Sequence, residues 1–226
     1  MGYELVFLDL DGTVLDFARA EREALAGLFS GHGLALDGRT KEAYERVNRA
    51  LWAALERGET TIGELKVERF RRLFAETGIG EDAERWSADY IDRLSRGIFP
   101  IEGAEETCAY LAGKYRLVAI SNGIAAVQRL RVANSFLARH VDLLIVSEEA
   151  GCAKPDPAIF EYASREAGFH DKARMVMVGD SLASDIQGAV NFGIDSCWTN
   201  LEGARPAPGI VPTCEVRTLA ELREIL

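Results

Sequence analysis

Two carboxylates, Asp9 and Asp11, directly follow a short apolar run near the start of the chain. The run, residues 5–8, predicts a buried strand, and Gly12 then lets the backbone turn away. Because side chains alternate along a strand, the two acids begin on the same face at its carboxyl end, where open α/β sheets bind ligands. Crowded acids repel and need a cation or a shared proton, so the pair suits a nucleophile, an acid–base group and a bound Mg²⁺ ion. The alternative is a plain strand-end turn, since Asp-Gly is a common turn pair.

A second predicted strand, residues 116–120, ends in Ser121 and Asn122. A hydroxyl and an amide at that position can donate hydrogen bonds to an anion, and the N-terminus of the following helix adds backbone N–H groups. Taken alone, the same residues could be an ordinary helix cap.

Lys154 directly precedes Pro155, which predicts the first turn of a helix. A lysine at this position can neutralise phosphate oxygens and a nearby carboxylate, although a solvated surface lysine is the alternative.

Two more carboxylates follow the apolar strand predicted over residues 174–178. Asp180 comes at the end of that strand and suits magnesium. Asp185 begins the next helix and can face back toward the loop, or it can simply favour the helix dipole as an acid of the first turn.

Composition narrows the function classes. The chain has 226 residues, 48% of them hydrophobic, which allows one large domain or a domain with a sizeable insertion. A formal net charge of −10 argues against a nucleic-acid-binding face, but it leaves room for one small phosphorylated substrate. Four cysteines without a C-x-x-C pair and three histidines argue against structural zinc. The first residues carry no basic region, and their apolar run is too short for a signal peptide or a membrane span, so we expect a cytoplasmic protein without membrane contact.

Hydrophobic periodicity divides the chain into two kinds of sequence. Residues 16–97 show helical spacing without clear strands, whereas strands alternate with helices from Pro100 onward. This pattern predicts an α/β fold, a doubly wound, Rossmann-like parallel sheet, interrupted after its first strand by a four-helix insertion. We expect a core of residues 1–15 plus 98–226 and a helical cap of residues 16–97. The predicted cap helices are 17–29, 44–55, 62–74 and 86–94; the later predicted strands are 116–120, 141–146, 174–178 and 194–198; and the later predicted helices begin near 125, 155, 184 and 219.

As a set, these motifs resemble the haloacid dehalogenase-like (HAD) hydrolase superfamily. Its pattern is D-x-D-x-T, then a Ser or Thr at a strand end, then a Lys, and then G-D-x-x-x-x-D. Every part is present in order, and the resemblance spans nearly the whole chain. The matching residues are Asp9, Asp11, Thr13, Ser121, Lys154, Asp180 and Asp185.

The resemblance implies a reaction and a role for each motif. Asp9 is expected to attack phosphorus and form an aspartyl-phosphate, while Asp11 protonates the leaving oxygen and later deprotonates the attacking water. Mg²⁺ is expected to bind the Asp9 side chain, the Asp11 backbone carbonyl and Asp180. The remaining expected roles are phosphoryl binding by Ser121, Asn122 and Lys154, support of Lys154 or of metal-bound water by Asp185, and support from Thr13.

The dehalogenase branch of the same superfamily is the first alternative. That branch cleaves a carbon–halogen bond, uses no magnesium and replaces the second motif acid. Since Asp11 is present, phosphoryl transfer is favoured.

Three stretches of the cap, residues 47–52, 58–61 and 68–70, are similar to the cap of house-cleaning pyrimidine 5′-nucleotidases. Two core stretches, 147–155 and 197–200, are similar to that group as well. The resemblance implies that the substrate is a nucleoside monophosphate.

Three cap residues are candidates for substrate specificity. On a helix, Asn48 and Trp52 share a face, so Trp52 could stack on a base or sugar while Asn48 supplies hydrogen bonds. Arg69 could meet a hydroxyl or carbonyl of the substrate. The alternatives are that Trp52 packs inside the cap and that Arg69 is a surface charge.

The sequence thus predicts a Mg²⁺-dependent phosphomonoesterase, a 5′-nucleotidase for (deoxy)ribonucleoside monophosphates. The alternatives are a phosphatase for phosphoglycolate or a sugar phosphate, and a non-catalytic interaction protein. The assembly, monomer or homodimer, stays open. We also expect Tyr44 to belong to the cap core, Phe17 to anchor the first cap helix, and Trp198 to pack at the sheet edge.

Overall fold

A computed structural model describes residues 2–206 and 208–226 of the chain. Its residues form two compact units. The core unit comprises Met1–Ala18 and Ile98–Leu226, and the helical unit comprises Arg19–Gly97. In the described part of the chain, no helix combines the length and apolar character that crossing a membrane requires.

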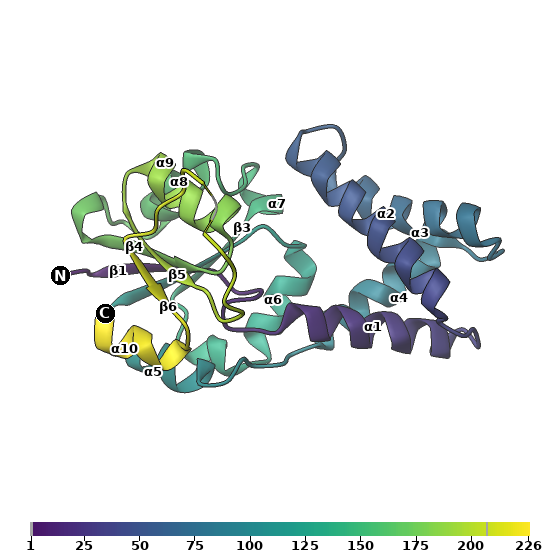
Figure 1. Cartoon of the computed structure of the whole chain (residues 1–226), viewed down its shortest axis with the longest axis horizontal. Helices are drawn as coiled ribbons and strands as arrows, with labels where there is room; N and C mark the ends of the chain where they lie inside the picture. Colours follow the sequence, from purple (N-terminus) through teal and green to yellow (C-terminus); the bar gives the residue numbers. More distant parts are fainter. Residues whose placement is uncertain (1, 207) are drawn as a thin grey trace. The chain divides into compact units, whose positions relative to one another are not determined.

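The core unit contains a six-stranded sheet in the order β3-β2-β1-β4-β5-β6, with every neighbouring pair parallel (Figure 1). This confirms the predicted doubly wound α/β fold. The strands are β1 (Leu5–Leu8), β2 (Arg116–Ser121), β3 (Leu143–Val146), β4 (Met175–Gly179), β5 (Asp195–Thr199) and β6 (Cys214–Val216).

Helices cover both faces of the sheet, which explains why the central strands are continuous apolar runs. Alternate residues of β1 point to opposite faces: Val6 packs in one cluster with α5 (Ala104–Ala112), and Phe7 packs in another with α8 (Pro157–Glu166). Figure 1 shows α5 and α10 on one side of the sheet and α8 and α9 on the other. The remaining helices of this unit are α6 (Ala125–Ala133), α7 (Ser147–Ala150), α9 (Gln187–Phe192), α10 (Leu222–Ile225) and the short turns η1 (Phe136–Arg139), η2 (Lys172–Arg174), η3 (Leu182–Ile186) and η4 (Leu219–Glu221).

The sheet differs from the sequence prediction mainly at β3 and at Trp198, while β2, β4 and β5 are each extended or shifted by one residue. β3 begins at Leu143 instead of residue 141. The preceding Asp142 makes two hydrogen bonds with the backbone of Leu117. Its side chain accepts from the Leu117 N–H at 2.8 Å, and its own N–H donates to the Leu117 carbonyl at 2.8 Å. The expectation that Trp198 packs at the sheet edge is wrong, because β5 lies between β4 and β6.

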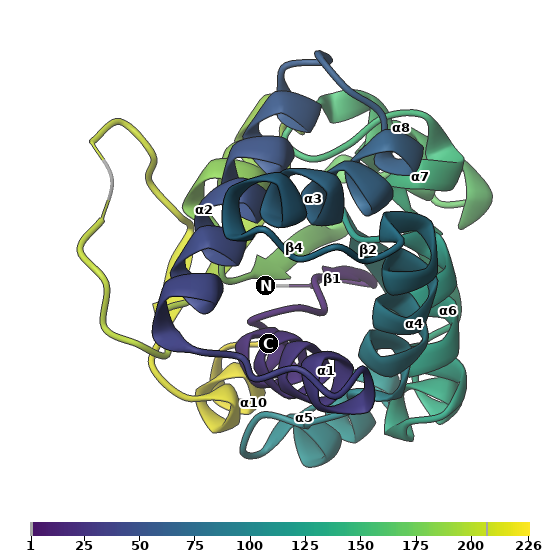
Figure 2. The same cartoon turned by 90° about the vertical axis from the view of Figure 1, so that its right-hand side faces the viewer.

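Four helices form the helical unit, and each of them is labelled in Figure 2. They are α1 (Phe17–Gly31, which begins in the core unit), α2 (Gly38–Glu56), α3 (Ile62–Thr77) and α4 (Ala83–Arg96). Side-chain caps start α2 and α4 earlier than periodicity predicts, because Asp37 accepts from Thr40 N–H at 2.7 Å and Asp82 accepts from two N–H groups of the first turn. As predicted, Tyr44 lies in the core of this unit, where its ring contacts Phe70 and Tyr90.

The chain segments that lead to and from the helical unit pair with each other inside the core unit. Asp16 N–H donates to the Phe99 carbonyl at 2.8 Å, and Ile101 N–H donates to the Val14 carbonyl at 3.0 Å. These bonds fix the ends of the insertion directly after the acidic loop.

Candidate active site

The polar strand ends meet at the point where the sheet reverses its winding. β1 lies between β2 and β4, and the chain runs outward from β1 through β2 to β3 before it returns to β4. In the sheet register, Leu8 lies opposite both Ala119 and Val178, so the residues that follow these three positions lie close together at the same edge of the sheet. Open α/β sheets bind their ligands in the crevice at such a switch point.

Lys154 is the central cation of this site and is almost completely buried. Its Nζ lies 2.6 Å from Asp9 Oδ1 and 2.7 Å from Asp185 Oδ1, and it donates to the Ile120 carbonyl at 2.7 Å. Burial lowers the pKa of Lys154, but the two carboxylates outweigh that effect and hold the pKa above its ordinary value. Lys154 is therefore a permanent positive charge next to Asp9.

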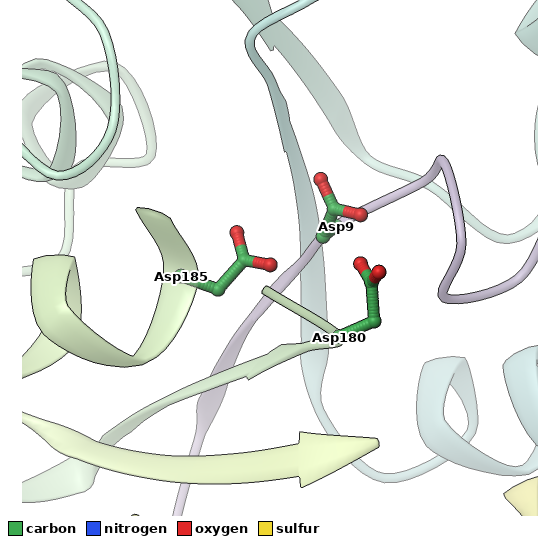
Figure 3. A group of neighbouring side chains, drawn as sticks. All are labelled: Asp9, Asp180 and Asp185. Carbon is green, nitrogen blue, oxygen red and sulfur yellow. The ribbon is translucent and has the colours of Figure 1, made fainter. Parts of the chain in front are cut away.

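Asp9, Asp180 and Asp185 form an acidic group, which we call by that name below. Each offers a carboxylate oxygen within 4.8 Å of the others, and Figure 3 shows the three carboxylates turned toward one another. Burial and then Asp9 raise the pKa of Asp180 to about 7. For Asp185, burial raises the pKa to about 6 although Lys154 opposes it. Two buried acids and the partly buried Asp180 surround one point and repel one another, and oxygen ligands of this kind suit Mg²⁺.

The loop after β1 holds Asp180 in place. The Thr13 hydroxyl lies 3.1 Å from Asp9 Oδ2 and 3.2 Å from Asp180 Oδ1, and it accepts a hydrogen bond from Asp180 N–H at 3.1 Å. Gly12 has a φ of +90°, and a Cβ at this position would lie 2.5 Å from Asp180 Oδ2. Trp198 Nε1 donates to the Asp180 carbonyl at 2.7 Å, a contact that no local pattern of residues predicts.

Ser121 and Asn122 occupy the end of β2 as predicted, but their side chains already have partners. Ser121 Oγ accepts from Gly123 N–H at 3.1 Å and from Gln128 Nε2 at 2.9 Å. Asn122 exchanges two hydrogen bonds with the backbone of Lys154, donating to its carbonyl at 2.8 Å and accepting from its N–H at 2.9 Å. The Asn122 side chain therefore positions Lys154.

Asp11 is separate from the acidic group. Its carboxylate accepts hydrogen bonds from Arg131 Nη1 and Gln128 Nε2, both on α6. Burial raises the pKa of Asp11, while Arg131 opposes the shift and Asp9 adds to it. Sequence reasoning missed both α6 residues. The two residues are three positions apart and therefore share one face of the helix, and this spacing was the only sequence feature that could have indicated a joint polar role.

Asn48, Trp52 and Arg69 all lie in the helical unit. Asn48 is buried and donates to Glu21 Oε1 at 2.9 Å. The alternative that Arg69 is a surface charge is wrong, since only 2% of the residue is exposed. Trp52 is partly buried against a small apolar cluster of Val47, Leu51 and Leu65.

Comparisons with a family model, with known proteins and with solved structures all match hydrolases over most of the chain. A family model described as haloacid dehalogenase-like hydrolase matches residues 3–193. The chain is 33% identical to "Pyrimidine 5'-nucleotidase YjjG" of Escherichia coli (strain K12), covering 100% of this chain and 99% of that protein. It is 34% identical to "Pyrimidine 5'-nucleotidase PynA" of Streptococcus pneumoniae (strain ATCC BAA-255 / R6), covering 100% and 96%. The magnesium-bound crystal structure of the HAD-hydrolase YfnB from Bacillus subtilis matches with a TM-score of 0.91 at 33% identity, covering 100% of this chain and 99% of that one.

Proposed function

Since the chain belongs to the haloacid dehalogenase-like hydrolase family, we propose that it is a Mg²⁺-dependent phosphomonoesterase that hydrolyses nucleoside 5′-monophosphates. One observation carries the proposal: Asp9 is paired with the buried Lys154 and lies beside two further acids at the switch point of the sheet. A nucleophile, a fixed cation and a metal-binding group are the parts that phosphoryl transfer needs.

The acidic group fits a magnesium ion. Asp180 and Asp185 have raised pKa values because they are buried near other acids, so a divalent cation would relieve their repulsion. Asp9, Asp180 and the Asp11 backbone carbonyl would hold the ion, with Asp185 close by. When bound, magnesium supplies positive charge for the oxygens of the transferring phosphoryl group.

In the proposed reaction an Asp9 carboxylate oxygen attacks phosphorus. The new bond joins Asp9 to phosphorus, the bond from phosphorus to the nucleoside oxygen breaks, and Asp11 gives that oxygen a proton. In the second step Asp11 takes a proton from water as the water oxygen attacks phosphorus, which releases inorganic phosphate and restores Asp9. Lys154 neutralises charge on the phosphoryl oxygens throughout.

Four other residues support this reaction in the proposal. Ser121 and Asn122 form the phosphate-binding strand end, and the Asn122 side chain acts by holding Lys154. Thr13 orients Asp9 and Asp180. Asp185 keeps Lys154 charged and in place.

Residues 16–97 are proposed as the specificity cap for the nucleoside. The names of YjjG and PynA, both pyrimidine 5′-nucleotidases matched over the full chain, support this substrate class. Within the cap, Asn48 and Arg69 offer buried polar groups and Trp52 offers an aromatic face.

A panel of phosphomonoesters tests the proposal. Phosphate release would be measured from nucleoside 5′-monophosphates, phosphoglycolate and sugar phosphates, with Mg²⁺ and with a chelator. We expect nucleotides to have the highest kcat/KM, with activity that requires Mg²⁺ and is abolished in Asp9→Asn. A higher kcat/KM for phosphoglycolate or a sugar phosphate would contradict the nucleotidase assignment. If no ester released phosphate, the proposed phosphomonoesterase activity would be contradicted.

A further inference from the structure

Gln128 lies between the polar groups that follow β1 and β2. Its side chain comes from α6, and only 1% of the residue is exposed. Gln128 Nε2 donates to Ser121 Oγ at 2.9 Å and also donates to the Asp11 carboxylate. A single amide nitrogen therefore joins the proposed phosphate-binding hydroxyl to the proposed acid–base carboxylate.

Arg131 determines which end of the Gln128 amide faces these two groups. Arg131 Nη1 donates to Gln128 Oε1 at 3.2 Å. Because a guanidinium can only donate hydrogen bonds, the amide atom that faces it must be the oxygen. The NH₂ group of the amide must then face Ser121 and Asp11, so the direction of both hydrogen bonds follows from the neighbours of Gln128.

The hydrogen bonds that Ser121 accepts limit what its hydroxyl can do next. Gly123 N–H donates to Ser121 Oγ at 3.1 Å, and Gln128 Nε2 donates to the same oxygen. A serine hydroxyl has two lone pairs and one hydrogen. Since the two bonds occupy both lone pairs, Ser121 can still donate its hydrogen, and the partner that it can take is an acceptor such as a phosphoryl oxygen.

Gly123 provides the space that the Gln128 amide occupies. A Cβ at position 123 would lie 2.6 Å from Gln128 Nε2 and 3.1 Å from Gln128 Cγ. The φ angle of Gly123 lies outside the left-handed region, so the need for space, and not the backbone conformation, favours glycine here. The Ser-Asn-Gly sequence at the end of β2 therefore supplies both a hydroxyl and the room for the side chain that orients it.

We propose that Gln128 is a positioning residue that makes Ser121 an obligate hydrogen-bond donor to a phosphoryl oxygen. The inference rests on the proposed phosphomonoesterase function, because it explains how the phosphate-binding hydroxyl of that function is oriented. Phosphoryl oxygens are charged acceptors, and a donor that is already oriented binds them without first breaking another bond. Without the Gln128 amide, the hydroxyl could rotate and part of this advantage would be lost.

Two variants disturb the orientation of Ser121 in different ways. Gln128→Met deletes the amide and keeps much of the side-chain volume. Gly123→Ala retains the amide but displaces it, because Gln128 Nε2 is the far end of a flexible side chain. Gln187→Met is the matched control, since Gln187 lies in the same unit and its Nε2 donates to Asn191 Oδ1 at the surface of α9.

The readout is the Kd of inorganic phosphate, measured by calorimetric titration in the presence of Mg²⁺. We expect Gln128→Met and Gly123→Ala to weaken phosphate binding about tenfold and Gln187→Met to leave it unchanged. Ser121→Ala should weaken binding by about tenfold or more. In the Ser121→Ala background, Gln128→Met should have little further effect on the Kd, because Gln128 acts on phosphate through that hydroxyl.

The outcomes separate this inference from the proposed function. An unchanged phosphate Kd in Gln128→Met and Gly123→Ala, or no phosphate binding by the wild type, would overturn the inference even if the wild type hydrolyses esters. A tenfold effect of Gln128→Met that persists in the Ser121→Ala background would also overturn it, because Gln128 would then act through Asp11 or through the fold. Phosphate binding with the expected dependence on Ser121, but without phosphate release from any ester, would support the inference and contradict the proposed hydrolysis.

Discussion

The Arg131 guanidinium forms an ion pair with the Asp11 carboxylate, although the Arg131 side chain has no exposed surface. The guanidinium carbon also lies 5.8 Å from the centroid of the Phe17 ring, at the first residue of α1. Arg131 therefore touches both the proposed acid–base residue and the start of the helix that leads into the helical unit. We regard it as a positioning residue for Asp11.

Arg131→Met should impair proton transfer more than any other step. Without its cation, Asp11 loses the orientation needed to protonate a leaving oxygen, and such a proton transfer contributes about 10²–10⁴-fold to rate. We expect kcat/KM on uridine 5′-monophosphate, which reports the step in which the leaving oxygen is protonated, to fall about 10²-fold. The fall on p-nitrophenyl phosphate should be much smaller, because its leaving group departs as a stable anion.

Two further variants serve as controls for that comparison. Arg131→Lys should recover part of the lost rate. Arg129 lies on α6 like Arg131, is exposed and pairs with Glu149, so Arg129→Met should leave the rates on both substrates unchanged. Equal losses of kcat/KM on both esters in Arg131→Met would indicate a general disturbance of the fold and would contradict the positioning role.

Lys154→Met should destabilise the metal-free protein as well as abolish turnover. The substitution leaves Asp9 and Asp185 buried without their cation, and removing one partner of a buried ion pair costs about 3–5 kcal/mol. Urea unfolding with a chelator present would measure the loss. Lys41→Met, which removes an exposed partner of Glu45, should leave the midpoint unchanged; a wild-type midpoint in Lys154→Met would refute the structural role.

The acidic group should make the stability of the metal-free protein fall with rising pH. The pKa of Asp180 is raised from 3.8 to about 7 and that of Asp185 from 3.8 to about 6, mainly by burial. At a pH between the unfolded pKa of 3.8 and the raised pKa of each acid, the folded state binds more protons than the unfolded state. The stabilisation present at low pH is therefore lost as the pH rises through the pKa values of the folded state. Unfolding free energies at about pH 5.5 and about pH 8 measure it.

Asp180→Asn provides the control for that pH dependence. The substitution removes one of the two titrating groups, so the difference in unfolding free energy between the two pH values should shrink. In the wild type, saturating Mg²⁺ should oppose the loss of stability at the higher pH, because the metal binds the deprotonated acids. The same pH dependence in the wild type and in Asp180→Asn would show that other groups cause it.

Trp198→Phe should weaken magnesium binding without removing a metal ligand. The indole N–H holds the backbone carbonyl of Asp180 at 2.7 Å, and loss of such a supporting hydrogen bond costs about 10–100-fold in metal affinity. Calorimetric titration with Mg²⁺ would report the change. An unchanged Kd would mean that Thr13 and Gly12 are sufficient to orient Asp180.

The sheet and the groups at its strand ends were predictable because they depend on local patterns. Apolar runs mark buried strands, and carboxyl ends of parallel strands meet at one edge, so the sequence alone is enough to bring Asp9 and Asp180 together. Lys154 lies eight residues beyond the end of β3, and only the resemblance to the family motifs predicted its place in the site. The caps at Asp37 and Asp82 show the limit of periodicity, which locates the apolar face of a helix and says little about its first turn.

Contacts between distant polar residues were not predictable in the same way. Arg131 and Gln128 look like the solvated side of α6, and only the path of the loop after β1 brings Asp11 onto them. Arg69 looks like a surface charge between other charged residues of α3, yet it is buried beside Tyr90. Trp198 contacts Asp180 because β5 follows β4 in the sheet, a strand order that one sequence does not specify.

Covalent labelling of Asp9 tests the central claim most directly. The protein would be mixed with Mg²⁺ and uridine 5′-monophosphate carrying ³²P, quenched in acid during turnover, digested, and its labelled peptide identified. We predict that the label lies on the peptide that contains Asp9 and disappears in Asp9→Asn. Steady release of phosphate with no labelled peptide, or with the label on a peptide that lacks Asp9, would contradict the account.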